Sequence, residues 1–199
     1  MSATRSPISL KGIDPEKFVT HMRDHYVAQF KAFVDEQRRS CAQGASELKL
    51  EPNSTTELFQ NLYCVDFIRR DGEDYQILEL GPGDMPCFDA IFASLGAAAL
   101  SIEPLRWNDV VVRHDLASTP IDEVARWFRR WFDPEDEWVD PNADLSGVIH
   151  SLLIKPGALS VDFGTAPVDA FWEMLGVLGR AGARNIQIGG SSVNTTMAH

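Results

Sequence analysis

His150, Ser151 and Asp162 are the residue types of a hydrolytic triad, in which a histidine base activates a serine hydroxyl. The pair Pro156-Gly157 predicts a hairpin turn, and a register centred there sets Ser151 opposite Asp162. Adjacent strand residues point to opposite faces, so His150 lies on the other face and cannot serve as the base for Ser151. We therefore expect His150 to be a hydrogen-bonded histidine of the core.

Two further patterns have the spacing of metal ligands. His21 and His25 lie at i and i+4, a spacing that can hold zinc on a helix, but both fall outside the apolar stripe of that helix. Asp140, Asn142 and Asp144 alternate like the start of a calcium loop, but the glycine needed at the sixth position is missing. We interpret the histidines as surface polar residues and the acids as a solvated loop, and we predict no metal site.

Residues 77–84, Ile-Leu-Glu-Leu-Gly-Pro-Gly-Asp, form the pattern that most strongly indicates a cofactor. They resemble the first motif of Rossmann-type S-adenosylmethionine-dependent methyltransferases, in which a hydrophobic strand ends in an acid and a glycine loop approaches the cofactor. Glu103 follows where that family places a second acid for the ribose hydroxyls. The resemblance implies a cofactor site at Glu79, Gly81, Gly83 and Glu103.

The same pattern occurs twice, which offers a structural explanation for the glycines. We call residues 76–102 the first copy and residues 159–188 the second copy. Each predicts a strand, an acid-x-Gly sequence, a loop with proline, a helix, Gly-Ala and a strand. In an internal ββαβ pseudo-repeat, Gly81 and Gly164 simply end strands where the chain turns sharply.

The densest aromatic and cationic run lies at residues 126–132, Arg-Trp-Phe-Arg-Arg-Trp-Phe. As a helix it buries Phe128 and Trp131 and exposes its arginines. Its simpler interpretation is an amphipathic helix whose arginines meet the acids just downstream. Because tryptophan and arginine are enriched in interface hot spots, the functional interpretation is a partner-binding surface. That surface would consist of Arg126, Trp127, Arg129 and Arg130.

The elements that position these residues follow from periodicity and turn signals. Asp14-Pro15 predicts a helix start, and Asp71-Gly72 predicts a hairpin with Arg69 opposite Asp74 and Arg70 opposite Glu73. Residues 87–95 are predicted to be helical. The predicted order is α-ββα-ββα-ββα-β, an α+β fold with a largely antiparallel sheet. The predicted divisions are a tail at 1–13, an N-terminal helix at 14–40, a linker at 41–57, a single α+β domain at 58–190 and a tail at 191–199.

Composition restricts the class of function. A formal net charge of −11 over 199 residues argues against broad nucleic-acid binding and is compatible with a basic protein partner. No apolar run approaches the roughly 20 residues of a membrane span, and the N-terminus does not resemble a secretory signal. The cysteines Cys41, Cys64 and Cys87 lack CxxC spacing, which favours reduced thiols in the cytoplasm.

These observations predict a small acidic cytoplasmic protein that acts without catalysis, as a protein-binding or regulatory module. Small immunity-type proteins, which neutralise a partner, are the functional analogy. No cofactor is expected in this interpretation. The alternative is a methyltransferase-like enzyme that uses residues 79–83 and Glu103.

Overall fold

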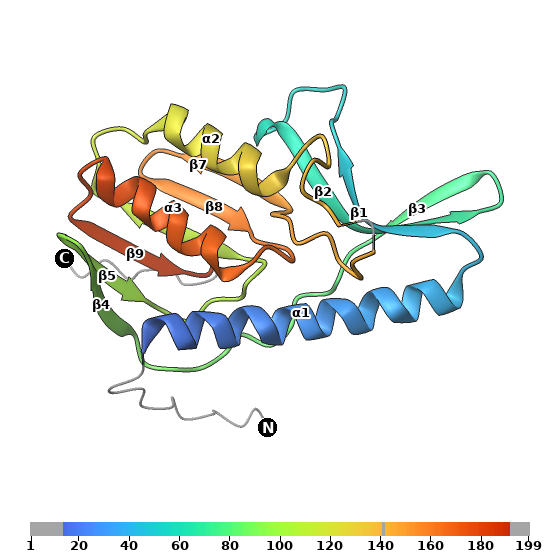
Figure 1. The fold of residues 1–199 in the computed structure, drawn as a ribbon, viewed down its shortest axis with the longest axis horizontal. Helices are drawn as coiled ribbons and strands as arrows, with labels where there is room; N and C mark the ends of the chain where they lie inside the picture. Colours follow the sequence, from blue (N-terminus) through green and yellow to red (C-terminus); the bar gives the residue numbers. More distant parts are fainter. Residues whose placement is uncertain (1–13, 141, 192–199) are drawn as a thin grey trace.

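The computed structural model describes residues 14–140 and 142–191, which form three helices and one nine-stranded, mostly antiparallel sheet (Figure 1). This is the mixed α+β class that the sequence predicts. The predicted tail 1–13, and the predicted tail 191–199 beyond Ser191, lie outside the described residues. The elements are α1 (Pro15–Ser40), β1 (Gly44–Leu50), β2 (Leu58–Asp71), β3 (Asp74–Leu78), β4 (Ile91–Leu95), β5 (Ala98–Ile102), β6 (Val110–His114), α2 (Ile121–Phe132), β7 (Ser151–Lys155), β8 (Ala158–Asp162), α3 (Val168–Arg180) and β9 (Asn185–Gly189).

Helix α1 begins at Pro15, directly after the capping residue Asp14. The Asp14 side chain accepts a hydrogen bond from the Glu16 N–H at 3.0 Å, and Pro15 occupies the first turn. Tyr26 and Phe30 are buried on the side of the helix that packs on the protein. The helix therefore presents an apolar stripe to the core and its remaining surface to solvent.

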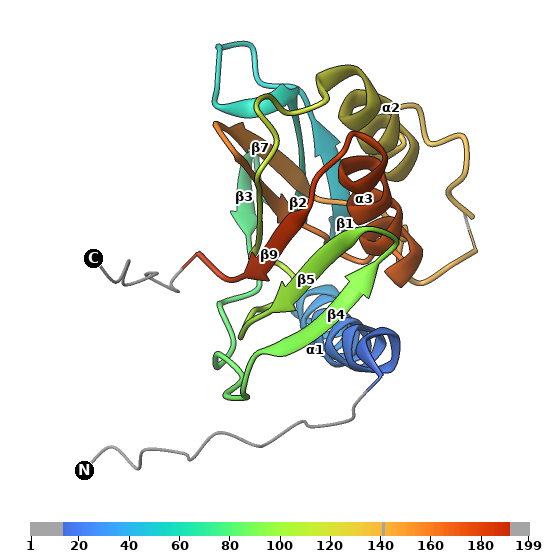
Figure 2. The ribbon, with the colours of Figure 1, turned by 90° about the vertical axis from the view of Figure 1, so that its left-hand side faces the viewer.

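The sheet runs in the order β1-β2-β7-β8-β6-β9-β5-β4, with β3 paired to β2. Strands β5 and β9 run parallel, and the other paired strands run antiparallel. Helices α2 and α3 lie on one face of the sheet, and α1 runs along its lower side (Figures 1 and 2). The main core lies between the sheet and these helices, where Phe128, Phe163 and Phe171 are fully buried.

The hairpin of β7 and β8 has the predicted register. Ser151 pairs with Asp162 across the two strands, and Gly157 takes the left-handed conformation (φ 69°) that its turn requires. The prediction that separates His150 from Ser151 therefore starts from a correct register.

Two predicted segments differ from the structure. Residues 41–57, predicted as a linker, contain β1, and residues 87–95, predicted as a helix, contain β4. Gly96 (φ 59°) turns β4 directly into β5, and the five residues of β4 are too short for periodicity to distinguish a strand from a helix. The first copy thus has β4 where the second copy has α3.

The β2–β3 hairpin also differs in detail from its prediction. The turn lies at Gly72 and the residue after it, so Arg69 pairs with Gln76 and Arg70 with Tyr75. The Arg69 Nε donates to Gln76 Oε1 at 2.9 Å, and the Arg70 guanidinium lies 5.7 Å from the Tyr75 ring centre. Neither arginine faces the acid predicted for it, because the predicted turn was misplaced by one residue.

Candidate functional site

A cleft of about 990 Å³ lies between the N-terminal half of α1 and two irregular segments of the chain. Its walls come from α1 between Lys17 and Gln29, from residues 80–88 and from residues 106–108. Figures 1 and 2 show the segment between β3 and β4 passing beside α1. We call this feature the α1 cleft.

The walls of the α1 cleft are rich in aromatic side chains. The rings of Phe18 and Phe88 meet edge to face at 4.7 Å between centroids, and both residues line the cleft. Trp107, also on the wall, is 1% exposed and packs on Phe163 at 4.7 Å. Such walls favour a ligand with an apolar, planar body.

The same walls contain hydrogen-bonding groups that the protein does not satisfy. Within the described part of the chain, neither the Tyr26 hydroxyl nor the Trp107 indole N–H has a hydrogen-bond partner, although both atoms are buried. Burial, with the nearby carboxylates of Asp162 and Asp66, raises the pKa of Tyr26, so its hydroxyl stays protonated. A buried unsatisfied polar group costs about 1–3 kcal/mol, so a ligand that hydrogen-bonds to either atom would recover part of that cost.

A buried charged cluster lies behind the cleft and is centred on His150. Its Nε2 lies 3.3 Å from Glu47 Oε1, and its Nδ1 lies 3.0 Å from Asp66 Oδ1. Burial alone lowers the pKa of a histidine, but contacts with Asp66 and Glu47 outweigh it and raise the pKa of His150 to about 10. His150 is therefore an imidazolium held by two carboxylates, and its prediction as a hydrogen-bonded core histidine is confirmed.

Glu47 is adapted to this position in the cluster. Burial alone raises the pKa of Glu47, but bonds from His150, Thr165 and the Ser146 N–H lower it overall. The residue also takes a left-handed backbone conformation (φ 52°) within β1, which costs a non-glycine residue on the order of 1 kcal/mol. Sequence reasoning missed Glu47, because the segment that contains it was predicted as a linker.

The cluster is connected to the cleft through Asp66. Its Oδ2 accepts a hydrogen bond from the Leu80 N–H at 2.7 Å, and Leu80 lines the cleft. The carboxylate that binds His150 therefore also anchors the irregular segment that forms one wall. The cluster positions the cleft and does not open into it, since the His150 side chain is 2% exposed.

The structure places the residues implied by the methyltransferase resemblance in two locations. Gly81 and Gly83 line the α1 cleft, with Glu79 exposed just before them, whereas Glu103 follows β5 and accepts a bond from Gln187 Nε2. The strand before the glycines, β3, pairs antiparallel with β2, and the segment after them leads into β4. This arrangement differs from the parallel strand, loop and helix of a doubly wound sheet.

Trp127 is not part of an exposed surface on α2. It is 2% exposed, and its Nε1 donates to the Ala170 carbonyl at 2.9 Å. The helix is rotated relative to its prediction, so that Trp127 enters the core and Trp131 is only partly buried. The predicted partner surface thus loses its first tryptophan.

The arginines of the predicted partner surface do lie outside the core. Arg126 pairs with Glu123 at 3.3 Å, and Arg130 pairs with Glu173 at 3.2 Å. Arg129 is exposed. Two of the three arginines are therefore already matched by acids of the protein.

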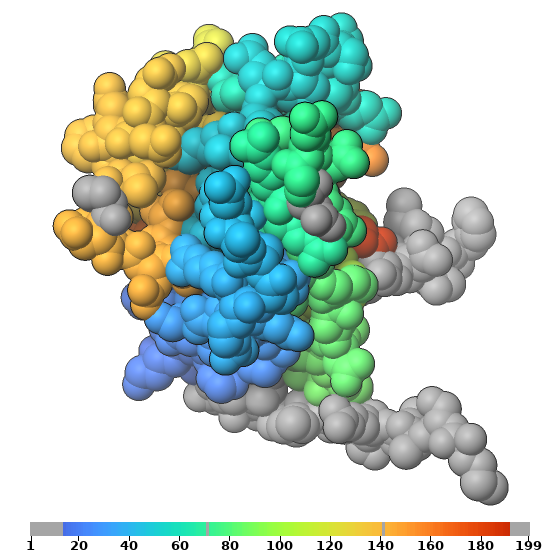
Figure 3. All heavy atoms as spheres, turned by 90° about the vertical axis from the view of Figure 1, so that its right-hand side faces the viewer, coloured from blue at the N-terminus to red at the C-terminus, as the bar shows by residue number. Residues whose placement is uncertain are grey.

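Residues 133–147, which we call the acidic loop, carry an exposed aromatic side chain. The Asp133 carboxylate accepts the N–H groups of Glu137 and Trp138, both at 2.9 Å, and the Lys49 ammonium contacts Asp136. These contacts hold the loop beside β1 on the face shown in Figure 3. Trp138 is 77% exposed on this anchored loop.

The two patterns that have the spacing of metal ligands lie in different surroundings. His21 and His25 line the α1 cleft, whereas Asp144 forms an ion pair with Lys31. The Asp140 carboxylate accepts the Asn142 N–H at 2.9 Å, as in a local turn. Over residues 14–140 and 142–191, no group of three or more His, Cys, Asp or Glu side chains is arranged to hold a metal ion.

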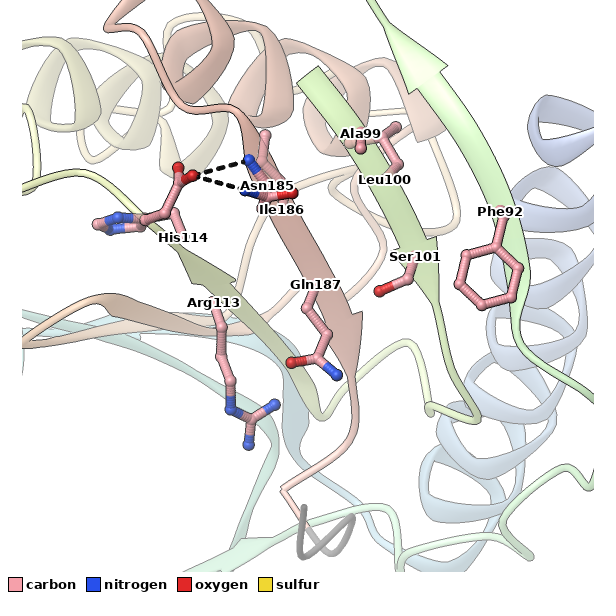
Figure 4. Close-up of a pocket in the computed structure, with 10 residues that line it drawn as sticks. Phe92, Ala99, Leu100, Ser101, Arg113, His114, Asn185, Ile186 and Gln187 are labelled. Carbon is pink, nitrogen blue, oxygen red and sulfur yellow. Dashed lines mark hydrogen bonds between the residues drawn. The ribbon is translucent and has the colours of Figure 1, made fainter. Parts of the chain in front are cut away.

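A shallower groove of about 400 Å³ lies on the sheet beside β9. Phe92, Ser101, Gln187 and Arg113 extend into it from the neighbouring strands β4, β5, β9 and β6 (Figure 4). At one end the Asp115 carboxylate accepts bonds from the backbone and side chain of Asn185. This groove is more open than the α1 cleft and is lined by isolated side chains of a sheet surface.

Comparison with known proteins assigns no family to the chain. No family model matches it, and neither a curated protein nor a solved structure matches it. In the described residues, no helix is long and apolar enough to cross a membrane.

Proposed function

We propose that this protein is a non-enzymatic binding module that takes a small organic molecule into the α1 cleft. The observation that carries the proposal is a cleft of about 990 Å³ with aromatic walls, in which the Tyr26 hydroxyl and the Trp107 N–H have no partner among the described residues. Ligand sites are typically concave and mostly apolar, with volumes of roughly 300–1,000 Å³ and a few polar groups that fix orientation.

The non-enzymatic part of the proposal is supported by the state of His150. A general base must have a nitrogen free to take a proton from a substrate. Both ring nitrogens of His150 face carboxylates, and the residue is 1% exposed. Its contacts suit a positioning role, in which it holds Asp66 and through it the wall segment at Leu80.

A fluorescence titration with the neutral probe N-phenyl-1-naphthylamine tests the proposal. Gly81 lines the cleft, a Cβ there would meet no atom within 4 Å, and its φ is not left-handed, so Gly81→Phe adds a ring beside the cleft without backbone strain. Gly179 in α3 has the same properties away from the cleft, so Gly179→Phe is the matched control.

We expect the probe to bind the wild type, and Gly81→Phe to weaken binding at least about tenfold, which corresponds to about 1.4 kcal/mol. Gly179→Phe should leave binding unchanged. Equal binding to the two variants, or no binding to the wild type, contradicts the proposal.

Capture of a basic protein partner is a second candidate function, and Trp138 is the observation that favours it. An exposed tryptophan on an anchored loop resembles an interface hot spot more than a core residue. The loop around it is acidic, in a chain with a net charge of −11, so the complementary partner is a segment rich in arginine or lysine. Regulation of such a partner, as immunity-type proteins do, fits this surface by analogy.

The second candidate is tested with a fluorescent octa-arginine peptide followed by anisotropy. Trp138→Ser should weaken binding about fivefold or more, and Phe92→Ser is the control, since Phe92 is equally exposed at 79%. Equal loss in both variants contradicts a specific surface. If octa-glutamate binds instead, and binding is lost when Arg126, Arg129 and Arg130 are changed to glutamate, the partner surface lies on α2.

A further inference from the structure

We propose that the ligand of the α1 cleft is an organic anion, in which an apolar ring carries a carboxylate or sulfonate group. This inference rests on the proposed function, because it names the chemistry of the ligand for the same site. It is carried by the charges on the walls and by an arginine that is held in place with one donor unused.

The described lining residues of the cleft include more basic than acidic side chains, unlike the chain as a whole. Lys17, His21 and His25 follow one another at intervals of four residues, so they share one face of α1 along the cleft. Arg106 lies on the other wall, and Asp84 is the one acid among the described lining residues. In a protein with 29 acidic and 18 basic residues, a wall of this composition selects against cations and for anions.

Arg106 is the group best placed to bind an anion. Its Nη2 donates to Asp109 Oδ2 at 2.8 Å, and its Nη1 donates to the Gly83 carbonyl at 3.4 Å. Its Nε is buried and has no acceptor in the described part of the chain, and the same holds for the indole N–H of the next residue, Trp107. A carboxylate or sulfonate accepts hydrogen bonds from donors of this kind, and these two belong to consecutive residues of one wall.

The apolar walls indicate the rest of the ligand. The edge-to-face pair of Phe18 and Phe88 lines the same cleft, together with Met22 and Met85. Aromatic rings and methionine side chains favour contact with a flat apolar body. The anionic group would then approach Arg106, and the ring would lie against these side chains.

The test compares two probes that differ by one charged group. N-phenyl-1-naphthylamine is neutral, and 1-anilinonaphthalene-8-sulfonate carries the same rings with a sulfonate. We expect the sulfonate to bind at least about tenfold more tightly to the wild type. Gly81→Phe should weaken the binding of both probes, which places them in the cleft.

Charge variants then locate the anion. Arg106→Gln should reduce the advantage of the sulfonate to about twofold or less. Because Arg106 also contacts Asp109, Lys17→Gln serves as a second variant. The Lys17 side chain is exposed and forms no hydrogen bond or ion pair among the described residues, and its loss should reduce the advantage about threefold. Lys155→Gln, an exposed lysine in β7, is the control and should change nothing.

The outcomes separate the two proposals. If both probes bind with equal affinity, the anion inference is wrong and the proposed function stands. If neither probe binds, both are wrong. If the sulfonate keeps its advantage in both Arg106→Gln and Lys17→Gln, the anion inference is overturned, because other residues then bind the charged group.

Discussion

The first and second copies begin with similar residues, but the glycine of the first copy lies beside a cleft and that of the second lies in the core. In the second copy, Gly164 has φ 48°, and a Cβ placed there would lie 2.1 Å from the His150 ring. In the first copy, a Cβ at Gly81 would meet nothing within 4 Å. Strand β8 lies between β7 and β6 in the centre of the sheet, whereas β3 is attached to β2 beside the main path. The comparison teaches that the same residue pattern can be required by packing in one place and can leave room for a ligand in another.

The largest expected effect separates the two glycines. Gly164→Ala forces an alanine into a left-handed conformation and displaces the imidazolium that binds Glu47 and Asp66. Disrupting a buried ion pair costs about 3–5 kcal/mol, and we expect a loss of that size in the free energy of unfolding. Gly81→Ala should change it by less than about 0.5 kcal/mol. Urea denaturation of both variants measures the difference, and equal losses would remove the distinction between the copies.

A second expectation concerns the charge of His150, whose ring packs against Gly164. The pKa of His150 is about 10 in the folded protein and 6.5 ordinarily, so its stabilising contribution is complete below pH 6.5 and is lost as pH rises through 10. His150→Gln should therefore reduce the free energy of unfolding by about 2–4 kcal/mol at pH 7. The gap between wild type and variant should shrink by pH 10.5. A gap that is constant with pH contradicts a buried imidazolium.

A smaller effect, on the affinity for a ligand, should come from Asp66, which anchors the wall segment of the first copy at Leu80. Asp66→Asn leaves one side-chain oxygen to serve both His150 and the Leu80 N–H, so the wall segment of the cleft loosens. We expect a threefold to tenfold loss of N-phenyl-1-naphthylamine affinity in a fluorescence titration. Asp162→Asn, which has no contact with Leu80 among the hydrogen bonds of the described residues, should leave the affinity within about twofold. Equal losses would show a general loosening of the fold instead.

The smallest effect should come from the acids that precede the two glycines. Burial raises the pKa of Asp162 to about 6, above its ordinary 3.8, so its charge destabilises the fold above pH 6 and has no such effect below pH 4. Asp162→Asn keeps an acceptor for the Gly164 N–H and should stabilise the protein by about 1 kcal/mol at pH 8, but not at pH 4. Glu79→Gln, at an exposed position, should leave the free energy of unfolding unchanged at both pH 8 and pH 4. A destabilised Asp162→Asn at pH 8 contradicts this account.

The sequence predicts the elements whose local signals agree with their tertiary environment. The cap at Asp14 and the Pro156-Gly157 turn are local features, and both act as predicted. The register of that turn alone is enough to separate His150 from Ser151. The helix predicted at 87–95 is wrong because sheet pairing with β5 decides the conformation of so short a segment.

The candidate site was less accessible to sequence reasoning, because its parts are far apart in the chain. One pattern singled out His21 and His25 and another singled out Gly81 and Gly83, and the fold brings all four to one cleft. Glu47 had no signal of its own, since its role depends on a histidine 103 positions away. The alternation Leu48-Lys49-Leu50 could have indicated a strand there, but not the partner of Glu47.

The most direct test of the α1 cleft uses protein labelled with ¹³C in the methionine methyl groups. Met22 and Met85 line the cleft, whereas Met174 is fully buried in α3 and serves as an internal control. On titration with N-phenyl-1-naphthylamine, the methyl resonances of Met22 and Met85 should shift together, with that of Met174 unchanged. A probe that binds while Met22 and Met85 stay unshifted would show that its site lies elsewhere, and would contradict the α1 cleft as the binding site.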